Sequence, residues 1–325
     1  MGMDKMSSRM NNWSINPGLI KMGDELGRGS FGVVRSAEWR HTPVAIKILY
    51  EDAQSQDMEL FEREVKMMAT LHHPHIVQFF GYTRTPALAL VIELFPEGSI
   101  ERYVPNSKPG AKASLKICTD MGLAIEYLHS RSPSIVIHRD IKPANFLLTA
   151  SFCVKLGDFG IARARRDQSM RRVGSTQSLD HSTHSELGDS SLRGGDRPMD
   201  RDDNLTSNCG TVRFMAPEVA STDGARTSKY TAAADIFSLA MVYYFVWERI
   251  LPGIAGHGTP TLHLEALYAG KRPQYHRTPK VMREIIDSMW ANEGENRPNA
   301  DALLKQLTNL RCKSSFGTTQ IAPAT

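Results

Sequence analysis

The side chain of Lys47 could carry out phosphate chemistry, because it ends a short apolar run at residues 44–46. A lysine that closes such a strand directs its ammonium toward a partly buried place, where the charge needs anionic partners. A triphosphate is one candidate partner. The carboxylate of Glu64 is the other, since Glu64 lies beside the apolar stripe of a helix predicted over 57–70.

A second group of polar residues lies in the string His-Arg-Asp-Ile-Lys-Pro-Ala-Asn at 138–145. Asp140 could orient an attacking hydroxyl and accept its proton. Lys142 could steady a transferring phosphoryl group, and Asn145 could bind a metal ion through its amide oxygen. Asp158, in Gly-Asp-Phe-Gly, offers a carboxylate oxygen of the kind that Mg²⁺ prefers.

A glycine-rich turn precedes all of these residues. Its pattern, Gly-x-Gly-x-x-Gly at 27–32, is a weak signal by itself, because dinucleotide-binding folds use it too. In those folds a helix follows the glycines, whereas residues 33–39 favour a strand here. We therefore predict a hairpin that covers phosphates with its backbone N–H groups. A Rossmann-type oxidoreductase would also need an acidic residue about 20 residues further on, where this chain has Lys47.

These residues fall on a strand-rich region that is followed by a helical one. Besides the helix at 57–70, the first region has strands predicted around the glycine turn at 23–38, and at 44–50, 76–82 and 87–94. In the second region, the apolar periodicity predicts helices at 114–130, 235–247, 281–290 and 300–310. The fold class is therefore α+β, with a small β-rich lobe and a large, mainly helical lobe.

The composition excludes several classes of protein. Apolar residues make up 41% and charged residues 23% of the 325 residues, values typical of soluble globular proteins. A net charge of +4 indicates neither a nucleic-acid nor a membrane partner. No two of the four cysteines form a CxxC pair, so no zinc site or redox motif is predicted. No targeting segment or membrane span is visible, and we expect a cytoplasmic protein with reduced thiols.

We divide the chain into a flexible leader at 1–17, an N-terminal lobe at 18–94, a C-terminal lobe at 95–310 and a flexible tail at 311–325. Residues 160–213 include no Phe, Tyr or Trp and are rich in Ser, Arg, Asp and Gly. Such a segment cannot bury enough apolar surface to offset its ordering entropy. Residues 164–206 are therefore predicted to be a disordered insertion.

Together these strings resemble the eukaryotic protein kinases. The matching motifs follow the family's order at 27–34, 44–47, 138–145, 158–160 and 216–218, and Arg297 stands where the family pairs an arginine with Glu218. The resemblance covers nearly the whole chain, from Trp13 to Leu310. It implies a bilobal fold, transfer of the γ-phosphate of ATP to protein hydroxyls, and Mg²⁺, or alternatively Mn²⁺, as the metal ion.

The resemblance also assigns roles to individual residues. Lys47, Glu64, Asp140 and Lys142 would be catalytic, while Asn145 and Asp158 would hold the metal ion. Ile92 would be the gatekeeper, and the backbones of Glu93 and Phe95 would bind adenine. The full set of nucleotide contacts would be Gly27, Gly29, Ser30, Phe31, Gly32, Val34, Ala45, Lys47, Ile92, Glu93, Phe95 and Leu147. A stacked spine would consist of Met68, Phe79, His138 and Phe159, with Asp235 as its support.

Within the family, Lys142 and the string at 210–218 resemble the serine/threonine kinases of the tyrosine-kinase-like group. The implied partners are protein substrates that present Ser or Thr, in signal transduction, with no nucleic acid and no membrane span. The alternative is a kinase-fold scaffold or signalling adaptor without catalysis. That alternative would require damage to Lys47, Asp140, Asn145 or Asp158, and all four are intact.

The same resemblance implies regulation by phosphorylation of the activation segment, residues 158–218. Arg139, beside Asp140, is placed to bind a phosphate with bidentate hydrogen bonds. Thr206 and Ser207 are the candidate activating sites, and self-association would allow trans-autophosphorylation. At the Thr211 position, the family places a side chain that contacts the catalytic aspartate.

Overall fold

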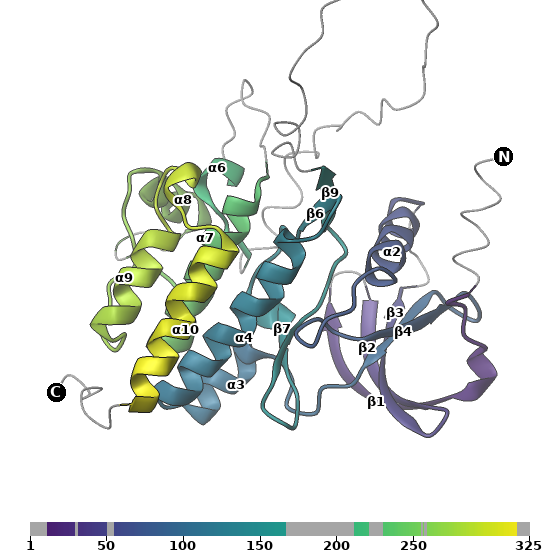
Figure 1. The fold of residues 1–325 in the computed structure, drawn as a ribbon. Helices are drawn as coiled ribbons and strands as arrows, with labels where there is room; N and C mark the ends of the chain where they lie inside the picture. Colours follow the sequence, from purple (N-terminus) through teal and green to yellow (C-terminus); the bar gives the residue numbers. More distant parts are fainter. Residues whose placement is uncertain are drawn as a thin grey trace, which may run out of the picture.

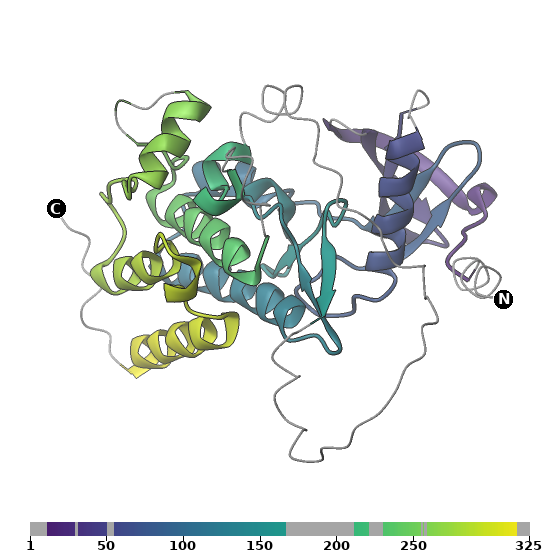
Figure 2. The same ribbon diagram turned by 90° about the horizontal axis from the view of Figure 1, so that it is seen from above.

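The computed structural model describes residues 12–29, 32–50, 55–166, 211–220, 230–254, 256 and 259–316. A small β-rich lobe lies beside a larger helical lobe, as the two perpendicular views show (Figures 1 and 2). This arrangement confirms the predicted α+β class with two lobes. Among the described helices, none combines the length and the apolar character needed to cross a membrane.

The smaller lobe is built on an antiparallel five-stranded sheet in the order β1-β2-β3-β5-β4. The register sets Val34 opposite Lys47 and Ala45 opposite Ile92. Helix α2 (Ser55–Met68) belongs to the same lobe, and the apolar face predicted for this helix is buried. The strands are β1 (Ile20–Gly29), β2 (Gly32–Trp39), β3 (Thr42–Leu49), β4 (Phe79–Thr83) and β5 (Ala89–Glu93).

Helix α7 (Ala232–Glu248) is apolar on nearly every side and is therefore buried along most of its length within the larger lobe. The other helices are α3 (Ile100–Ser107), α4 (Ala111–His129), α6 (Pro217–Ala220), α8 (Pro260–Tyr268), α9 (Lys280–Met289) and α10 (Ala300–Phe316). Short 3₁₀ turns are η1 (Pro17–Leu19), η2 (Pro143–Asn145), η4 (Thr211–Phe214) and η5 (Gly294–Asn296).

Helices α3 and α8 were not predicted, because prolines obscure both. Pro105 lies inside α3, where a proline removes a backbone hydrogen bond. Pro260 opens α8, a position at which proline is favourable. The hydroxyl of Thr259 accepts a hydrogen bond from the N–H of Leu262 (3.3 Å), so an N-cap signal was present in the sequence.

The predicted flexible leader at 1–17 is wrong for its last six residues. The N–H of Tyr82 donates to the carbonyl of Trp13 (2.9 Å), and the N–H of Ile15 donates to the carbonyl of Tyr82 (2.8 Å). The ring of Trp13 packs 5.3 Å from that of Phe79, and Ile15 is buried. Two apolar side chains separated by one residue thus hold this stretch against β4. Residues 1–11 lie outside the described part of the chain.

Two further boundaries need correction. Strand β9 (Arg163–Arg166) pairs with β6 (Ser134–Ile137), so 164–166 do not belong to a disordered insertion. Pairing with a distant strand orders this polar stretch, which composition cannot reveal. Helix α10 extends six residues into the predicted tail, since no Pro or Gly interrupts 300–316. The rest of the predicted insertion, 167–206, and of the tail, 317–325, lies outside the described residues.

The predicted pair between Arg297 and Glu218 is confirmed. The Arg297 guanidinium donates two parallel hydrogen bonds to the Glu218 carboxylate, at 2.6 and 2.9 Å. It also donates to the carbonyls of Ala233, Ala291 and Asn292. The arginine side chain is fully buried, so this fork of donors joins α6, α7 and the segment before α10.

Replacing Arg297 with lysine should therefore destabilise the larger lobe. A single ammonium cannot reach all of these acceptors, and we expect a loss of about 3–5 kcal/mol in the free energy of unfolding, measured by denaturant titration. Lys305→Met is the control, because its pair with Asp301 is exposed and should change stability by less than about 0.5 kcal/mol. Equal effects of the two substitutions would contradict a structural role for the Arg297 fork.

Candidate active site

An ion-pair network joins the two lobes at the candidate site. The Lys47 ammonium on β3 lies 3.0 and 3.1 Å from the two carboxylate oxygens of Glu64 on α2. It also lies 3.0 Å from Oδ1 of Asp158, in the segment that follows β8 (Val154–Leu156). The sequence allowed Glu64 or a phosphate as the partner of Lys47, and the structure brings Glu64 and Asp158 to it.

Burial and charge act against each other in this network. Burial alone would lower the pKa of Lys47, but the two carboxylates outweigh it and raise this pKa, so the ammonium stays protonated. Burial raises the pKa of Glu64, and Lys47 offsets this only in part. The charge of Lys47 lowers the pKa of Asp158, whose side chain remains 46% exposed. Asp158 is thus an accessible, ionised carboxylate.

Asp140, Lys142 and Asn145 form a second cluster on the loop that ends in η2. The Lys142 ammonium lies 2.7 Å from Oδ2 of Asp140. The side-chain amide of Asn145 donates to the same oxygen (3.0 Å) and to the Asp140 carbonyl (2.7 Å). These contacts hold the Asp140 carboxylate in a defined orientation, and the structure thus brings together the three polar residues that the sequence singled out in this string.

A buried carboxylate supports that loop. Asp235 on α7 accepts hydrogen bonds from the backbone N–H groups of His138 (2.8 Å) and Arg139 (2.9 Å). His129, on α4, brings its Nε2 within 3.0 Å of the same carboxylate. Arg139 has a φ of 73°, a strained value that persists only where surrounding contacts impose it. The sequence did not reveal His129, since 106 residues separate it from Asp235.

His138 links this loop to the segment that carries Asp158. Its Nε2 lies 3.0 Å from the Gly157 carbonyl, and its Nδ1 accepts from the Asp140 N–H at 3.3 Å. Both contacts suit a neutral imidazole with its proton on Nε2, a tautomer assigned from these bonds. The ring packs edge-on against Phe159, with 4.9 Å between centroids. This is the predicted spine contact, and the other two spine residues, Met68 and Phe79, are buried as well.

The predicted glycines differ in what surrounds them. A Cβ atom added to Gly32 would lie 1.9 Å from the carbonyl oxygen of Ile48, so packing against β3 requires glycine there. A Cβ added to Gly27 or Gly29 would meet no atom within 4 Å. The packing of the described residues therefore does not explain these two glycines, and space is left for a ligand to approach the backbone. Ser30 and Phe31, also predicted to contact nucleotide, lie outside the described residues.

The predicted adenine contacts lie on β2, β3 and β5 and on the segment that leads into the larger lobe, except for Leu147, which lies on β7 (Phe146–Leu148) of the larger lobe. Ala45 and Phe95 are buried, whereas Val34, Ile92 and Leu147 are partly buried. The Glu93 side chain forms an ion pair with Lys155 of β8, at 2.8 and 2.9 Å. The Glu93 N–H donates to the Gln78 carbonyl (3.0 Å).

The donor set suits magnesium. Asn145 uses its amide nitrogen to bind Asp140, which turns the amide oxygen away from that carboxylate. The Gly157 N–H donates to the Asn145 carbonyl (2.9 Å), which brings Asn145 next to the segment that carries Asp158. An amide oxygen and an ionised carboxylate are hard oxygen ligands, as Mg²⁺ requires.

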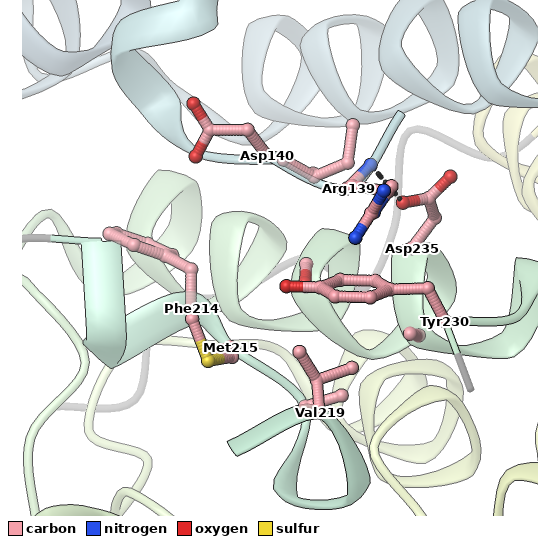
Figure 3. Close-up of a pocket in the computed structure, with 11 residues that line it drawn as sticks. Arg139, Asp140, Phe214, Met215, Val219, Tyr230 and Asp235 are labelled. Atoms are coloured by element: carbon pink, nitrogen blue, oxygen red, sulfur yellow. Dashed lines mark hydrogen bonds between the residues drawn. The ribbon is translucent and has the colours of Figure 1, made fainter. Parts of the chain in front are cut away.

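Arg139 occupies a pocket beside Asp140. Its guanidinium lies over the ring of Tyr230, 4.1 Å from the centroid, as Figure 3 shows. Apolar side chains from 214–219 line the opposite wall of this pocket. Tyr230 was not singled out from the sequence. Thr206 and Ser207, the candidate phosphate sites for Arg139, lie outside the described residues, and Thr211 is described only in its backbone, as the start of η4.

Comparisons with known proteins agree with this geometry. A family model described as protein tyrosine and serine/threonine kinase matches residues 20–182 and 177–307. The serine/threonine-protein kinase VIK of Arabidopsis thaliana is 29% identical over 311 residues, covering 92% of this chain and 62% of that protein. Human mitogen-activated protein kinase kinase kinase 7 is 28% identical over 297 residues, covering 90% of this chain and 42% of that protein. The chain thus spans less than two thirds of the length of these relatives.

Asp235→Asn should destabilise the protein in a pH-dependent way. Burial alone would raise the pKa of Asp235. The hydrogen bond and charge of His129, together with the other groups that donate to Asp235, outweigh burial and lower this pKa. Its contribution is therefore present above the unfolded pKa of about 4 and is lost as the pH falls through the lower folded pKa.

We expect a loss of about 3 kcal/mol in the free energy of unfolding at pH 7, and a smaller difference from the native sequence below about pH 4. Denaturant titrations at several pH values measure this difference. The exposed Asp301→Asn is the control. A difference that is independent of pH would show that the charge of Asp235 is not what supports the loop.

Proposed function

Because the chain belongs to the family of protein tyrosine and serine/threonine kinases, we propose that it transfers the γ-phosphate of ATP to serine and threonine hydroxyls of proteins. The observation that carries the proposal is the contact of one ammonium, Lys47, with carboxylates from both lobes, Glu64 and Asp158. Phosphoryl transfer depends on positioning and charge neutralisation, and such a network provides both.

Lys47 would bind phosphate oxygens of ATP. Glu64 holds its ammonium in place through two contacts, and the raised pKa of Lys47 keeps that ammonium charged. Gly27 and Gly29 leave room for the phosphates to reach backbone N–H groups of the hairpin. Ala45, Val34 and Leu147 would enclose the adenine, and the backbones of Glu93 and Phe95 would bind its edge.

Asp140 would receive the proton of the attacking hydroxyl. Its Oδ2 already binds Lys142 and Asn145, so we assign Oδ1 to the substrate hydroxyl. Lys142 would then steady the transferring phosphoryl group. The apolar wall of the pocket beside Asp140 would support the neighbouring part of a protein substrate.

Magnesium supplies neutralisation of the phosphate charge when it is bound. Asn145 and Asp158 would hold it through their side-chain oxygens. The lowered pKa of Asp158 keeps its carboxylate ionised at neutral pH, so no proton has to leave before the ion binds. Mn²⁺ accepts the same hard oxygen ligands and would serve as an alternative ion.

The preference for serine and threonine rests on Lys142, on the string at 210–218 and on the name of one relative, the serine/threonine-protein kinase VIK. Thr211 would contact Asp140 and contribute to that preference. A role in signal transduction would follow from phosphorylation of other proteins.

Asp140→Asn should lower turnover by roughly 10²–10⁴, the usual contribution of a general base. The assay follows transfer of labelled γ-phosphate from ATP and Mg²⁺ to the protein itself and to a generic basic protein, with Lys47→Met as the inactive control. Phosphoserine or phosphothreonine that disappears in Lys47→Met supports the proposal. No transfer by the native sequence, even after treatment with an upstream kinase, would instead favour a scaffold without catalysis.

Activation would depend on phosphate at Thr206 or Ser207 bound by Arg139, through trans-autophosphorylation between two copies. Thr206→Ala with Ser207→Ala should lower the activated rate, and should have no further effect when Arg139 is already alanine, because all three changes remove one interaction. Steady-state rates of the native sequence, the double variant, Arg139→Ala and the triple variant test this. Additive effects would separate Arg139 from these two residues. Deletion of 167–203 spares β9. If the insertion itself is inert, the shortened protein should show the same non-additive effect of the Arg139 and Thr206/Ser207 substitutions.

A further inference from the structure

We propose that His75, Asp120 and Cys153 form a binding site for Zn²⁺. These side chains come from three parts of the fold: the loop between α2 and β4, helix α4, and the residue before β8. One donor atom from each lies within 4.8 Å of the others. The site lies outside the candidate active site, and its test does not depend on the proposed kinase activity.

The sulfur and nitrogen donors already have the spacing that a zinc ion needs. Sγ of Cys153 lies 3.6 Å from Nδ1 of His75. With Zn–S near 2.3 Å and Zn–N near 2.0–2.1 Å, two ligands at a tetrahedral angle stand about 3.5 Å apart. The Val154 carbonyl oxygen lies 2.8 Å from the same nitrogen, so a further oxygen donor is adjacent.

The donor types select zinc over the hard cations. Thiolate and imidazole are poor ligands for Mg²⁺ and Ca²⁺ but favourable ones for Zn²⁺. The charges also balance, because one thiolate and one carboxylate neutralise the two charges of the ion. The sequence could not indicate this site, since 45 residues separate His75 from Asp120 and 33 separate Asp120 from Cys153.

The backbone around the site is fixed before any metal binds. The N–H of Leu156 donates to the His75 carbonyl, and the N–H of Val77 donates to the Leu156 carbonyl, both at 2.9 Å. The N–H of Val154 donates to Oδ2 of Asp120 (3.0 Å), and Asp120 is buried. The three donors therefore do not depend on loop closure to meet.

Zinc has to displace one cation and one proton. The Lys116 ammonium lies 2.6 Å from Oδ2 of Asp120, and its side chain, 38% exposed, can turn into solvent. The His75 ring must move its proton from Nδ1, which faces the Val154 carbonyl, to Nε2. The Cys153 thiol releases its proton to water as the Zn–S bond forms, and no electron is transferred.

A bound ion would tie the lobes together. The loop that holds His75 follows α2, the helix that carries Glu64, whereas Asp120 and Cys153 belong to the larger lobe. Zinc would therefore restrain the α2–β4 loop against α4 and β8, and we expect it to raise the melting temperature of the whole chain.

The first experiment titrates Co²⁺, the spectroscopic substitute for Zn²⁺, into the full chain after treatment with a chelator. We expect one ion to bind with a thiolate-to-cobalt charge-transfer band and intense tetrahedral d–d bands. Zn²⁺ should then abolish these bands by competition. A cobalt spectrum without a charge-transfer band, or no binding, would overturn the proposal.

Three variants assign the ligands. Cys153→Ser should abolish the charge-transfer band, and His75→Asn should weaken Zn²⁺ binding by at least the roughly 10–100-fold that the loss of an outer-shell partner costs. Lys116→Met should strengthen binding several-fold, because it removes the cation that competes for Asp120. That last variant is informative because a loss of folding cannot produce tighter binding.

Cys312→Ser, at an exposed thiol on α10, is the matched control and should leave the titration unchanged. Thermal unfolding of each variant in chelator verifies that it folds. A charge-transfer band that survives Cys153→Ser, or that disappears in Cys312→Ser, would place the bound ion elsewhere. Unchanged affinity in Lys116→Met would show that Asp120 is not a ligand.

Discussion

The buried carboxylate of Asp235 sets the geometry on which the candidate active site depends. It lies on α7 inside the larger lobe and accepts the N–H groups of two consecutive residues, His138 and Arg139. Those groups begin the loop that carries Asp140, and Arg139 keeps its left-handed backbone because both bonds hold it there. A buried charge is tolerable only when its oxygens are hydrogen-bonded. The same contacts therefore stabilise α7 and orient the loop.

The position of the smaller lobe relative to that loop depends on a different balance. The Lys47 ammonium lies between the carboxylates of Glu64 and Asp158. Burial disfavours the charged forms of Lys47 and Glu64. The network survives because each charge faces an opposite one at about hydrogen-bond distance. Because Glu64 belongs to α2, any shift of this helix changes the environment of the lysine and of Asp158 together.

Strand β8 adjoins both the loop supported by Asp235 and the ion-pair network of Lys47. It is followed by Asp158, it pairs Lys155 with Glu93, and its backbone bonds to the α2–β4 loop through His75 and Val77. The proposed zinc ligands surround its first residues. This short strand therefore contacts the α2–β4 loop of the smaller lobe and leads directly into the segment that carries Asp158.

The sequence by itself determined the lobes and most of the site. Apolar periodicity places Phe61, Val65 and Met68 on one face of α2, and short strings of fixed spacing hold Asp140, Lys142 and Asn145 within one loop. The rest depends on pairs far apart in the chain. His129 with Asp235, Tyr230 with Arg139, and Trp13 with Phe79 come into contact only in the folded chain. The local sequence pattern cannot predict such contacts, because an aromatic or histidine side chain gives the same pattern whatever residue it later contacts. Only the tertiary structure decides which distant residue becomes its neighbour.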